Sequence, residues 1–497
     1  MQIYPKKKYI LEQAKTTRRI PILGEKKINS LDIAQLYKNL VHENDEAFLF
    51  ESKKGSKNTS RYSFMGAPNN NYVKIDNTHS KFKLNGNSNE VIGTVEDGWK
   101  ILNFEDNVAS FNYSPHFWGG WVGYIAYEAC NSFEKLPKRK SNELGLPDAY
   151  FMQVDRLFVY DHNLNKLKYV IAAESYIDSS KYKKYINEIK NIWEEIETSL
   201  QKPSTKHDIE SPIKALNPSA IKMQSNLSSN EYKNIVNKAK VYIGEGDIYQ
   251  ANLSQRFDTK FNGDPLSLYL KLAKLNPAPF SGFLKFSDFS IISSSPERLI
   301  KLHGNKLETR PIAGTRPRGD NPIKDIALTT ELLLSEKERA EHLMLVDLER
   351  NDMGRVCKSG SINVTELMHL EQYSHVSHIV SNIEGELRPD ISIYELIKST
   401  FPGGTITGCP KIRCMEIINE LEPSSRGPYS GSFGYIGFCR QLDFNILIRT
   451  IFIKKGEATF HVGAGIVADS NPDSEYAETL SKAAAMIEVL SDQTSID

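Results

Sequence analysis

Strand-like segments occur throughout this 497-residue chain, and their spread constrains its fold more than any other feature. Apolar runs at 46–52 and 156–162 are typical of β-strands, and residues 119–129 form a run rich in glycine and aromatic residues. Further strand-like segments lie at 252–257, 281–286, 289–296, 431–438, 445–453 and 458–467. Helical periodicity separates them, as at 181–201. We therefore predict an α+β or α/β fold with large sheets.

A change of composition divides the chain near residue 220. Residues 202–220 are rich in proline, serine and charge, which is typical of a linker or surface excursion. A helix is then predicted to begin at Ser228, because Ser228 and Glu231 match a capping box, and to end at Gly244. The sequence thus predicts an N-terminal region at 1–220 and a second domain at 221–497.

Composition excludes several classes of protein. Lys+Arg and Asp+Glu both number 62, and this zero net charge argues against a nucleic-acid partner. No apolar run approaches the roughly 20 residues of a membrane helix, and the basic start lacks the apolar stretch of a signal peptide, so we expect a cytoplasmic protein without membrane contact. An odd, sparse set of cysteines predicts reduced, mostly buried thiols and neither a disulfide framework nor a zinc site. These are Cys130, Cys357, Cys409, Cys414 and Cys439.

The glycine-rich segment Phe401–Lys411, FPGGTITGCPK, resembles a phosphate-binding loop at first sight. A P-loop places lysine directly after its second glycine. Gly403 and Gly408 have the required spacing, but Cys409 follows and Lys411 comes too late. A nucleotide site is therefore not expected, and a tight turn that uses glycine for positive φ is the alternative.

The segment 334–352 carries carboxylates on an apolar helical face. Its strongest apolar stripe includes Leu334, Leu345 and Leu348. Glu338 and Glu341 fall on that stripe, although burying a bare carboxylate costs several kcal/mol unless it is compensated. A wide solvated face stays open as the alternative.

A second predicted helix starts at Asn471–Asp473 and places Glu475, Glu478 and Lys482 on one face. Alone, this pattern also fits an exposed Glu478–Lys482 pair worth about 0.3–0.5 kcal/mol. Together, two Glu pairs on separate helices can converge into a four-carboxylate site. Oxygen ligands without histidine or cysteine favour Mg²⁺.

Other residues fit a small anionic ligand. Arg449 lies in the strand-like run 445–453, where an arginine is costly without an anionic partner. Gly463 and Gly465 allow close approach of backbone to a ligand, with a β-bulge as the alternative. His378 follows alternating apolar positions and fits a structural role as well as a catalytic one.

Five motifs together resemble the chorismate-utilising enzymes, with component I of anthranilate synthase and of aminodeoxychorismate synthase as the nearest branches. They are RPIAGTRPRG, ERAEHLMLVDLERNDMGRV, YSHVSHIVSNIEGEL, FPGGTITGCPKIRCMEIINELEP and VGAGIVADSNPDSEYAET, within residues 225–490. The first half matches more loosely, through FLFESKKGSKNTSRYSFMG and GGWVGYIAYE. The resemblance implies two large sheets flanked by helices, and binding of chorismate with Mg²⁺.

The resemblance also assigns roles to the acidic residues. Glu341 and Glu478 would bind Mg²⁺ directly, while Glu338 and Glu475 would hold its water. The metal would anchor the ring carboxylate of chorismate and help the C4 hydroxyl to leave.

Further roles concern the organic substrate. The groups implied to hold the substrate carboxylates are Tyr429, Arg449, Lys482 and the backbone at Gly463 and Gly465. Gly314 and Thr315 would border the ring. Thr405 would reach the substrate, and the glycines of its loop would let backbone amides approach the anion. His378 would lie near the leaving hydroxyl, and together with Thr405 and Glu338 it completes the implied catalytic set.

The two branches differ at a few positions. Asn252, NPAPFSGF at 276–283 and GGTITG at 403–408 resemble the aminodeoxychorismate branch. Ala313 is usual in anthranilate synthases, and one aminodeoxychorismate group has a lysine there that is proposed as a covalent nucleophile. We therefore expect 4-amino-4-deoxychorismate, on the route to 4-aminobenzoate and folate, with anthranilate and pyruvate as the alternative products.

The resemblance finally predicts partners. Because no cysteine lies in an amidotransferase-like setting such as G-x-C-x-G, ammonia is expected to come from a separate glutamine amidotransferase subunit. Glu51 and Ser52 resemble part of a tryptophan pocket found across both branches. A non-catalytic regulatory homologue is the alternative of another class, and the retained acidic and basic residues argue against it.

Overall fold

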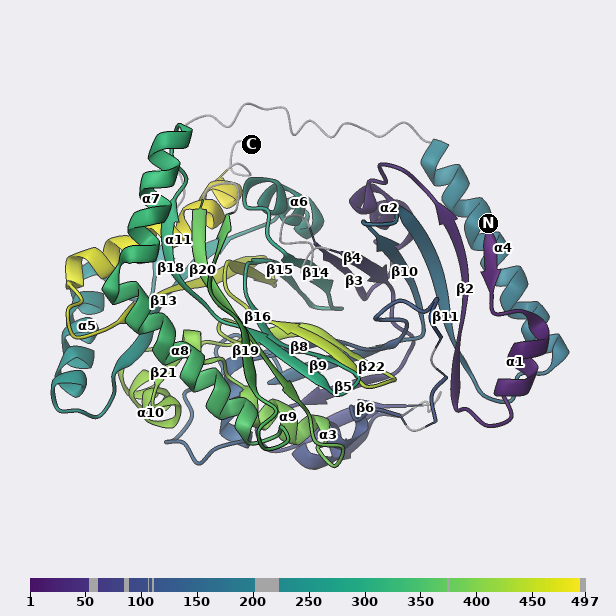
Figure 1. Cartoon of the computed structure of the whole chain (residues 1–497), viewed down its shortest axis with the longest axis horizontal. Coiled ribbons are helices and arrows are strands. Elements are labelled where there is room, and N and C mark those ends of the chain that lie inside the picture. Colours follow the sequence, from purple (N-terminus) through teal and green to yellow (C-terminus); the bar gives the residue numbers. More distant parts are fainter. Residues whose placement is uncertain are drawn as a thin grey trace.

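The computed structural model describes residues 1–52, 61–84, 89–105, 107–109, 111–201, 223–372 and 376–491, and all counts of elements refer to these residues. Two large β-sheets form the body of the molecule, and helices cover their outer faces (Figure 1). This arrangement confirms the predicted mixed fold of two large sheets flanked by helices.

The first sheet has 13 strands. In spatial order they are β1 (Gln2–Tyr4), β2 (Arg19–Lys27), β11 (Lys166–Glu174), β10 (Arg156–Asp161), β4 (Tyr62–Gly66), β3 (Ala47–Glu51), β14 (Phe280–Lys285), β15 (Phe289–Ser295), β24 (Thr450–Lys454), β25 (Glu457–Ile466), β13 (Gln250–Lys260) and β12 (Gln224–Ser225), with β21 (Gly408–Cys409) also on β13. All of its strand pairs are antiparallel.

The second sheet has 12 strands. Its order is β18 (Ile312–Pro317), β20 (Val376–Glu386), β17 (Lys306–Arg310), β16 (Arg298–His303), β23 (Gln441–Asn445), β22 (Ser432–Gly437), β8 (Gly120–Ile125), β9 (Ala149–Val154), β5 (Tyr72–Ile75), β6 (Ser80–Lys83) and β7 (Val91–Gly93), with β19 (Asn363–Gln372) also on β20. The two sheets share a buried cluster in which Phe50 of β3 stacks on Phe433 of β22 at 4.9 Å between ring centroids.

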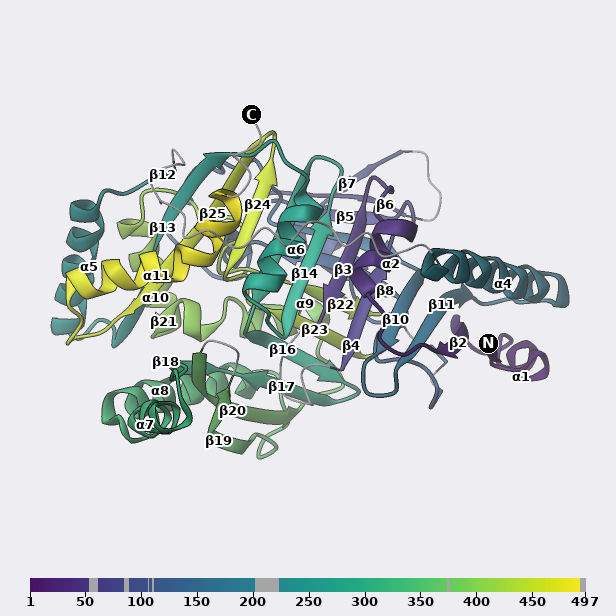
Figure 2. The same cartoon turned by 90° about the horizontal axis from the view of Figure 1, so that it is seen from above.

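Helices cover both sheets. On the first sheet, α2 (Ile33–Leu40), α4 (Ser179–Gln201), α6 (Pro265–Leu275) and α11 (Pro472–Ser491) contribute to one apolar cluster. On the second, α3 (Val95–Ile101), α8 (Glu336–Gly354) and α9 (Ile393–Thr400) do so. The others are α1 (Lys7–Gln13), α5 (Ser229–Gly244), α7 (Pro322–Leu334), α10 (Lys411–Leu421) and the 3₁₀ turns Tyr127–Ser132 and Gly404–Ile406. Figure 2 shows α7 and α8 grouped with β18, β19 and β20 beside the rest of the molecule.

Both sheets take strands from each side of residue 220. In the first, β3 pairs with β14, where Phe50 lies opposite Gly282. In the second, β8 pairs with β22, where Gly123 lies opposite Gly434. The predicted linker at 202–220 lies outside the described residues, so the boundary itself stays a prediction. What the sheets establish is that residues before and after it build the same two layers.

Local signals from the sequence are reproduced. The Ser228–Glu231 capping box starts α5, and the helix ends at Gly244. All cysteines are free thiols, with Cys130, Cys357 and Cys414 buried. No helix of the described residues is long and apolar enough to cross a membrane.

One predicted strand is wrong. The run 445–453 is interrupted, because β23 ends at Asn445 and β24 begins only at Thr450. Between them the chain bends, and Arg449 adopts a φ of 50°. This left-handed conformation is uncommon for a residue other than glycine and signals a constrained position.

Candidate active site

A cavity of about 790 Å³ lies between α8, α11 and the strands β13, β18, β20 and β25. It gathers most of the residues singled out from the sequence. Those that line it are Gly314, Thr315, Glu338, Glu341, His378, Thr405, Arg449, Gly465, Glu475, Glu478 and Lys482. Because these residues come from segments more than 150 positions apart, only the fold brings them together.

On α8, Glu338 and Glu341 lie in the first two turns, and the Ser335 side chain caps the helix by accepting from the Glu338 amide at 3.3 Å. Leu334 does not belong to the predicted stripe, because it ends the preceding α7 and is 68% exposed. Leu345, which lies on α8 with the two glutamates, is buried and lines the same cavity. Glu338 and Glu341 therefore share a face with Leu345, as predicted, and this face is turned to the cavity.

On α11, Glu475 is buried and Glu478 is half exposed. Glu478 pairs with Lys482 at 2.8 Å, as the simpler interpretation of the sequence predicts. Lys482 also donates to the Gly463 carbonyl at 3.0 Å. The helix therefore presents both an acidic and a basic group to the same cavity.

The four carboxylates interact electrostatically. Burial raises the pKa of Glu341, and Glu338, Glu475 and Glu478 raise it further, whereas Lys337 lowers it. Burial likewise raises the pKa of Glu475, and Glu478 adds to that shift. Negative charge is therefore concentrated at one end of the cavity, where a cation would relieve the repulsion.

Two of these carboxylates are paired with cationic side chains. Glu338 accepts from Arg316 at 3.1 Å, and Lys337 lies 3.9 Å from Glu341. Within the described parts of the chain, no group of at least three acidic, histidine or cysteine side chains is close enough to hold a metal ion. The chemistry of the set, hard oxygens without nitrogen or sulfur, still matches the ligands that Mg²⁺ takes in proteins.

The cavity also contains an arginine and a histidine. Arg449 donates to the Asn276 side chain at 3.3 Å, and its bent backbone carries the guanidinium to the cavity wall. His378 on β20 places Nδ1 at 2.9 Å from the Thr315 hydroxyl. Burial lowers the pKa of His378 to about 4, and the nearby Arg449 and Lys482 charges lower it too. The imidazole is thus neutral at pH 7.

Glycines form part of the floor. Gly463 and Gly465 lie in an unbroken register of β25 against β13, which excludes the β-bulge alternative. A Cβ on Gly463 would lie 2.7 Å from both the Asn252 Oδ1 atom and the Tyr429 hydroxyl. Tyr429 itself is buried. Glycine is needed here because these polar groups crowd over the strand.

The glycine-rich segment Phe401–Lys411 forms another wall. Thr405 lines the cavity, whereas the Gly404 amide donates to the buried Glu349 at 3.3 Å. That amide therefore faces a carboxylate of the protein, contrary to the expectation that it approaches a bound anion. Among the glycines of this loop only Gly408, at φ 134°, needs a conformation that other residues avoid. Lys411 pairs with the buried Asp352, which explains its late position as structural.

Glu297 is a buried carboxyl that the sequence analysis missed. It follows β15, accepts from the Ile312 amide at 3.4 Å and is 5% exposed. Burial raises its pKa to about 8, although the adjacent Thr405 hydroxyl and the Ile312 amide lower it. This buried carboxyl therefore lies directly behind Thr405, which lines the cavity. A glutamate directly after the apolar run 289–296 was the signal that could have found it.

Arg426 is a second residue that the sequence analysis missed, and it lies behind the part of the cavity wall formed by β13 and the Thr405 loop. Its guanidinium pairs with Glu422 at 2.6 Å and donates to the Ile406 carbonyl at 2.9 Å and the Asn252 carbonyl at 2.6 Å. It also donates to the Ser430 hydroxyl at 3.2 Å. One buried arginine thereby joins β13, the Thr405 loop and the segment that carries Tyr429.

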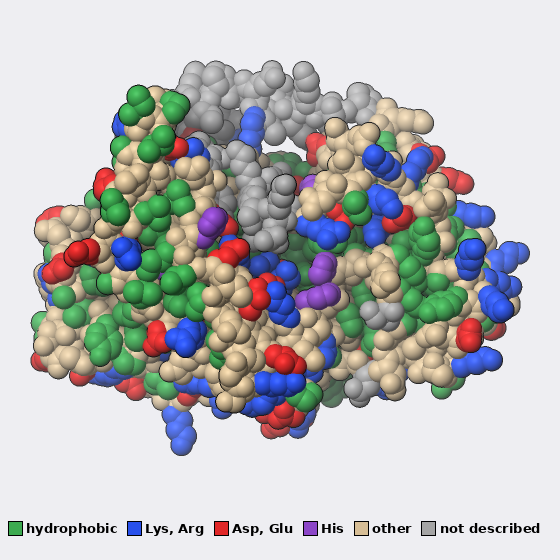
Figure 3. All heavy atoms as spheres, viewed as in Figure 1, with side chains coloured by type: hydrophobic (Ala, Val, Ile, Leu, Met, Phe, Trp, Pro, Cys, Tyr) green, Lys and Arg blue, Asp and Glu red, His purple; other side chains and the backbone are tan. Residues whose placement is uncertain are grey.

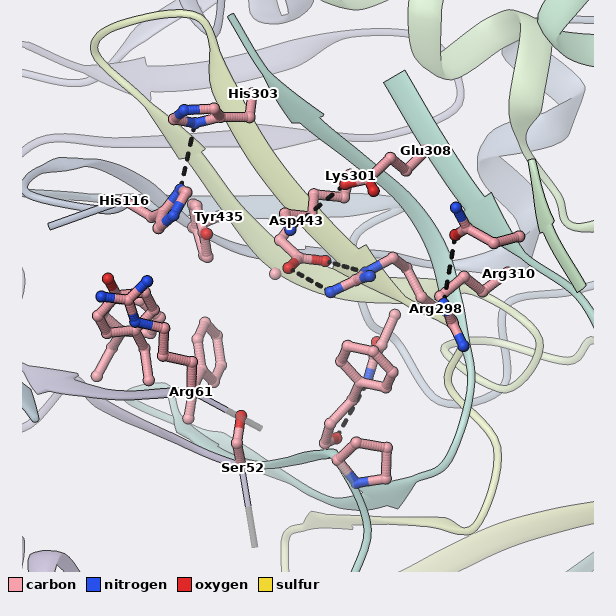
Figure 4. A pocket seen from close by; sticks show the side chains of 18 of the residues that line it. Ser52, Arg61, His116, Arg298, Lys301, His303, Glu308, Arg310, Tyr435 and Asp443 are labelled. Atoms are coloured by element: carbon pink, nitrogen blue, oxygen red, sulfur yellow. Dashed lines mark hydrogen bonds and ion pairs between the residues drawn. The ribbon is translucent and has the colours of Figure 1, made fainter. Parts of the chain in front are cut away.

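Glu51 and Ser52 lie elsewhere, in a separate cavity of about 740 Å³ between the two sheets (Figure 4). The Glu51 carboxylate accepts from the Tyr269 hydroxyl at 2.6 Å. In Figure 4 the labelled Arg298 and Asp443 face each other across a paired contact, and His116 approaches His303. The face in Figure 3 is hollowed near its centre, and lysine, arginine and histidine side chains gather there. The implied tryptophan pocket stays a prediction.

The fold and the residues of this cavity identify the enzyme family. The sequence model of the chorismate binding enzyme family matches residues 45–488, and the chain belongs to this family. It is 39% identical to anthranilate synthase component 1 of Acetivibrio thermocellus over 99% of both chains. It is 42% identical to aminodeoxychorismate synthase component 1 of Bacillus subtilis over 77% of this chain and 80% of that one.

A solved structure agrees. Anthranilate synthase component I from Streptococcus pneumoniae superposes with a TM-score of 0.73 at 31% identity, covering 86% of this chain and 92% of that chain. The fold and family predicted from the motifs are confirmed. The chain is a chorismate-utilising enzyme, and both branches named in the sequence analysis are among its relatives.

Proposed function

We propose that this chain is component I of an aminodeoxychorismate synthase, which converts chorismate and ammonia to 4-amino-4-deoxychorismate. The observation that carries the proposal is the polar amide of Asn252 in the cavity wall, at a position where the anthranilate branch tends to have an apolar residue. The 42% identity to the Bacillus subtilis aminodeoxychorismate synthase supports it.

The charges of the cavity suit chorismate, which carries two carboxylates. Arg449 and Lys482 lie in the wall as donors for one carboxylate, together with the Tyr429 hydroxyl under the floor. Such charge-assisted hydrogen bonds are stronger than neutral ones and fix the orientation of a planar anion. The neutral His378 stands across the cavity, where it would contact the ring hydroxyl.

Mg²⁺ would be held by Glu341 and Glu478, with Glu338 and Glu475 on its water, and it would supply Lewis-acid assistance to loss of the C4 hydroxyl. What supports this assignment is that all four carboxylates line one cavity, where burial and the neighbouring carboxylates raise the pKa of Glu341 and of Glu475. Rotation of the side chains out of their present ion pairs would bring them to a shared cation.

Ammonia would come from a separate glutamine amidotransferase subunit. The proposal rests on the component 1 names of both relatives and on the lack of an amidotransferase-like cysteine in the sequence. The purified chain should then use ammonium salts alone, and glutamine only together with that subunit.

Anthranilate synthase component I is the second candidate, and specific observations favour it. Ala313 lines the cavity and offers no nucleophile for a covalent amine adduct. The relative that matches 99% of the chain is an anthranilate synthase component 1. In either reaction ammonia attacks the ring directly.

Identification of the product tests the proposal. The chain is incubated with chorismate, an ammonium salt and Mg²⁺, and half of the sample then receives a 4-amino-4-deoxychorismate lyase. We expect 4-aminobenzoate in the lyase half alone. Fluorescent 2-aminobenzoate and pyruvate in both halves would instead establish the second candidate, and unchanged chorismate would indicate a non-catalytic homologue.

A further inference from the structure

Two features of Arg449 need support from neighbouring residues. Its backbone φ of 50° is uncommon for a residue with a side chain. Its guanidinium is a cation at the end of a long side chain, which loses rotamer entropy when it is held in one position. Groups that fix both the backbone and the guanidinium are therefore expected close by.

Hydrogen bonds on both sides of Arg449 fix its backbone. The Ser294 amide of β15 donates to the Arg449 carbonyl at 3.2 Å, and the Thr450 hydroxyl donates to the Ile448 carbonyl at 2.8 Å. Ser294 is fully buried, and the Ser293 and Thr450 hydroxyls lie 2.8 Å apart. The bend between β23 and β24 is thus tied to β15.

Asn276 fixes the guanidinium. Arg449 Nη1 donates to Asn276 Oδ1 at 3.3 Å, and both residues line the cavity. The orientation of the Asn276 amide follows from its partners, because a guanidinium only donates and therefore faces the amide oxygen. The amide nitrogen then faces the Ser294 carbonyl, to which it donates at 3.4 Å. One side chain thereby joins the guanidinium to the strand that fixes its backbone.

Asn276 itself stands on a rigid element. It is the C-cap of α6, where its backbone amide donates to the Leu272 carbonyl at 2.8 Å, and Pro277 follows directly. The Ser294 hydroxyl also donates to the Asn276 carbonyl. The helix packs on the first sheet and belongs to its apolar cluster (Figure 2). The position of Asn276 is therefore set independently of Arg449.

The neutrality of Asn276 suits an anionic ligand. A carboxylate in its place would pair with the guanidinium and compete with the bound anion. An amide oxygen occupies one of the several N–H groups of the guanidinium and leaves its positive charge in place. This charge acts inside the cavity, because, besides burial, Arg449 lowers the pKa of His378.

From this geometry we propose that Asn276 is a positioning residue for substrate binding, which holds the Arg449 guanidinium in the cavity wall without neutralising it. The inference rests on the proposed binding of a chorismate carboxylate by Arg449. It assigns Asn276 no contact with chorismate itself, so its effect passes entirely through Arg449.

The test is steady-state kinetics of chorismate consumption by the purified chain with Mg²⁺ and a saturating ammonium salt. Asn276→Ala removes the acceptor and should raise the KM for chorismate about tenfold, with kcat within about threefold of the parent. Arg449→Met should raise this KM by at least about 30-fold. Adding Asn276→Ala to Arg449→Met should then change the KM by less than about twofold, because the group that Asn276 positions is absent. The Kd for chorismate, measured by calorimetry with Mg²⁺ and without ammonia, gives the same comparison whichever product is formed.

Asn276→Asp is a second arm, because it keeps the side-chain volume and adds a charge. The new carboxylate should pair with Arg449 and raise the KM for chorismate at least as much as Asn276→Ala does. Asn419→Ala is the matched control. It removes an asparagine that donates to the Lys138 carbonyl at 3.3 Å and does not line the cavity, and it should leave the KM within about twofold.

Melting temperatures establish that each variant is folded, and Asn276→Asp decides the question if Asn276→Ala is not. An undiminished rise in KM when the Asn276 change is added to Arg449→Met would mean that Asn276 contacts chorismate directly, and would overturn the inference. Unchanged KM in both Asn276 variants would overturn it as well, while a raised KM in Arg449→Met would leave the proposed carboxylate site standing. Unchanged KM in Arg449→Met would instead remove that carboxylate site, and the positioning role with it.

Discussion

Replacing Arg426 with methionine tests the arrangement under the cavity floor. The substitution removes the partner of Glu422, whose carboxylate is 3% exposed. It also removes the donor from two carbonyls, those of Ile406 and Asn252. Breaking a buried ion pair from one side costs about 3–5 kcal/mol, because a charge stays behind without compensation.

The contacts that remain around Glu422 and the two carbonyls affect the size of this loss of stability. Glu422 keeps two donors after the change, the Ser254 amide at 2.7 Å and the Ser254 hydroxyl at 2.9 Å, which limits the penalty. The two carbonyls add to it unless water enters. We therefore expect Arg426→Met to lower the free energy of unfolding by about 3–5 kcal/mol, a large fraction of the roughly 5–15 kcal/mol of an ordinary protein.

Urea unfolding followed by tryptophan fluorescence measures this loss. Adding Glu422→Gln to Arg426→Met removes the stranded charge and should recover at least about 1 kcal/mol. Lys100→Met breaks the exposed pair with Glu96, in which both side chains are more than 60% exposed, and serves as the control, with no measurable loss of stability expected. A loss below about 1 kcal/mol for Arg426→Met, or a double variant no more stable than the single one, would refute the reasoning.

Three further predictions concern chemistry and pH. Glu341→Gln and Glu478→Gln should each reduce kcat by at least about 100-fold without a change in melting temperature. EDTA should abolish activity until Mg²⁺ is added, and full turnover in a metal-free assay would exclude a role for the metal. Glutamine alone should give no product with the purified chain, and robust glutamine-dependent turnover without a second subunit would contradict the assigned partner. The pKa of Glu297, about 8 against an ordinary 4.5, means that the folded state binds more protons, so its contribution to stability falls as the pH rises from about 5 to 8. Glu297→Gln should remove this fall, and Tm measured at pH 6 and pH 9 should therefore change less in the variant than in the parent; an equal change in both would show that the carboxyl is ionised throughout.

Sequence patterns predicted local features well. Capping at Ser228, the paired glutamates on α8 and α11, and the Glu478–Lys482 contact all depend on residues within one or two helical turns. Such short-range relations follow from the 3.6-residue period alone. The longer motifs identified the family, and the family resemblance predicted the two large sheets.

Features that depend on tertiary contacts could not be read in advance. The helix break at Ser335 separates Leu334 from the face that carries Glu338 and Leu345, and periodicity runs through such a break unnoticed. The bend at Arg449 interrupts an apolar run that looks like one continuous strand. Glu297 and Arg426 act through partners far along the chain, Thr405 and Asn252, and no window of sequence contains both.

Among the described residues, those of the first half of the chain do not line the candidate active site, yet they belong to the same structural unit. The cavity is lined by residues from Gln250 onward. The strands that carry them continue, through β3 against β14 and β8 against β22, into strands from the first 160 residues. Removing that half would expose the edges of both sheets and the inter-sheet cluster around Phe433. Residues such as Glu51 therefore lie in the layer on which the catalytic half is built, and a ligand in their cavity would contact both sheets at once.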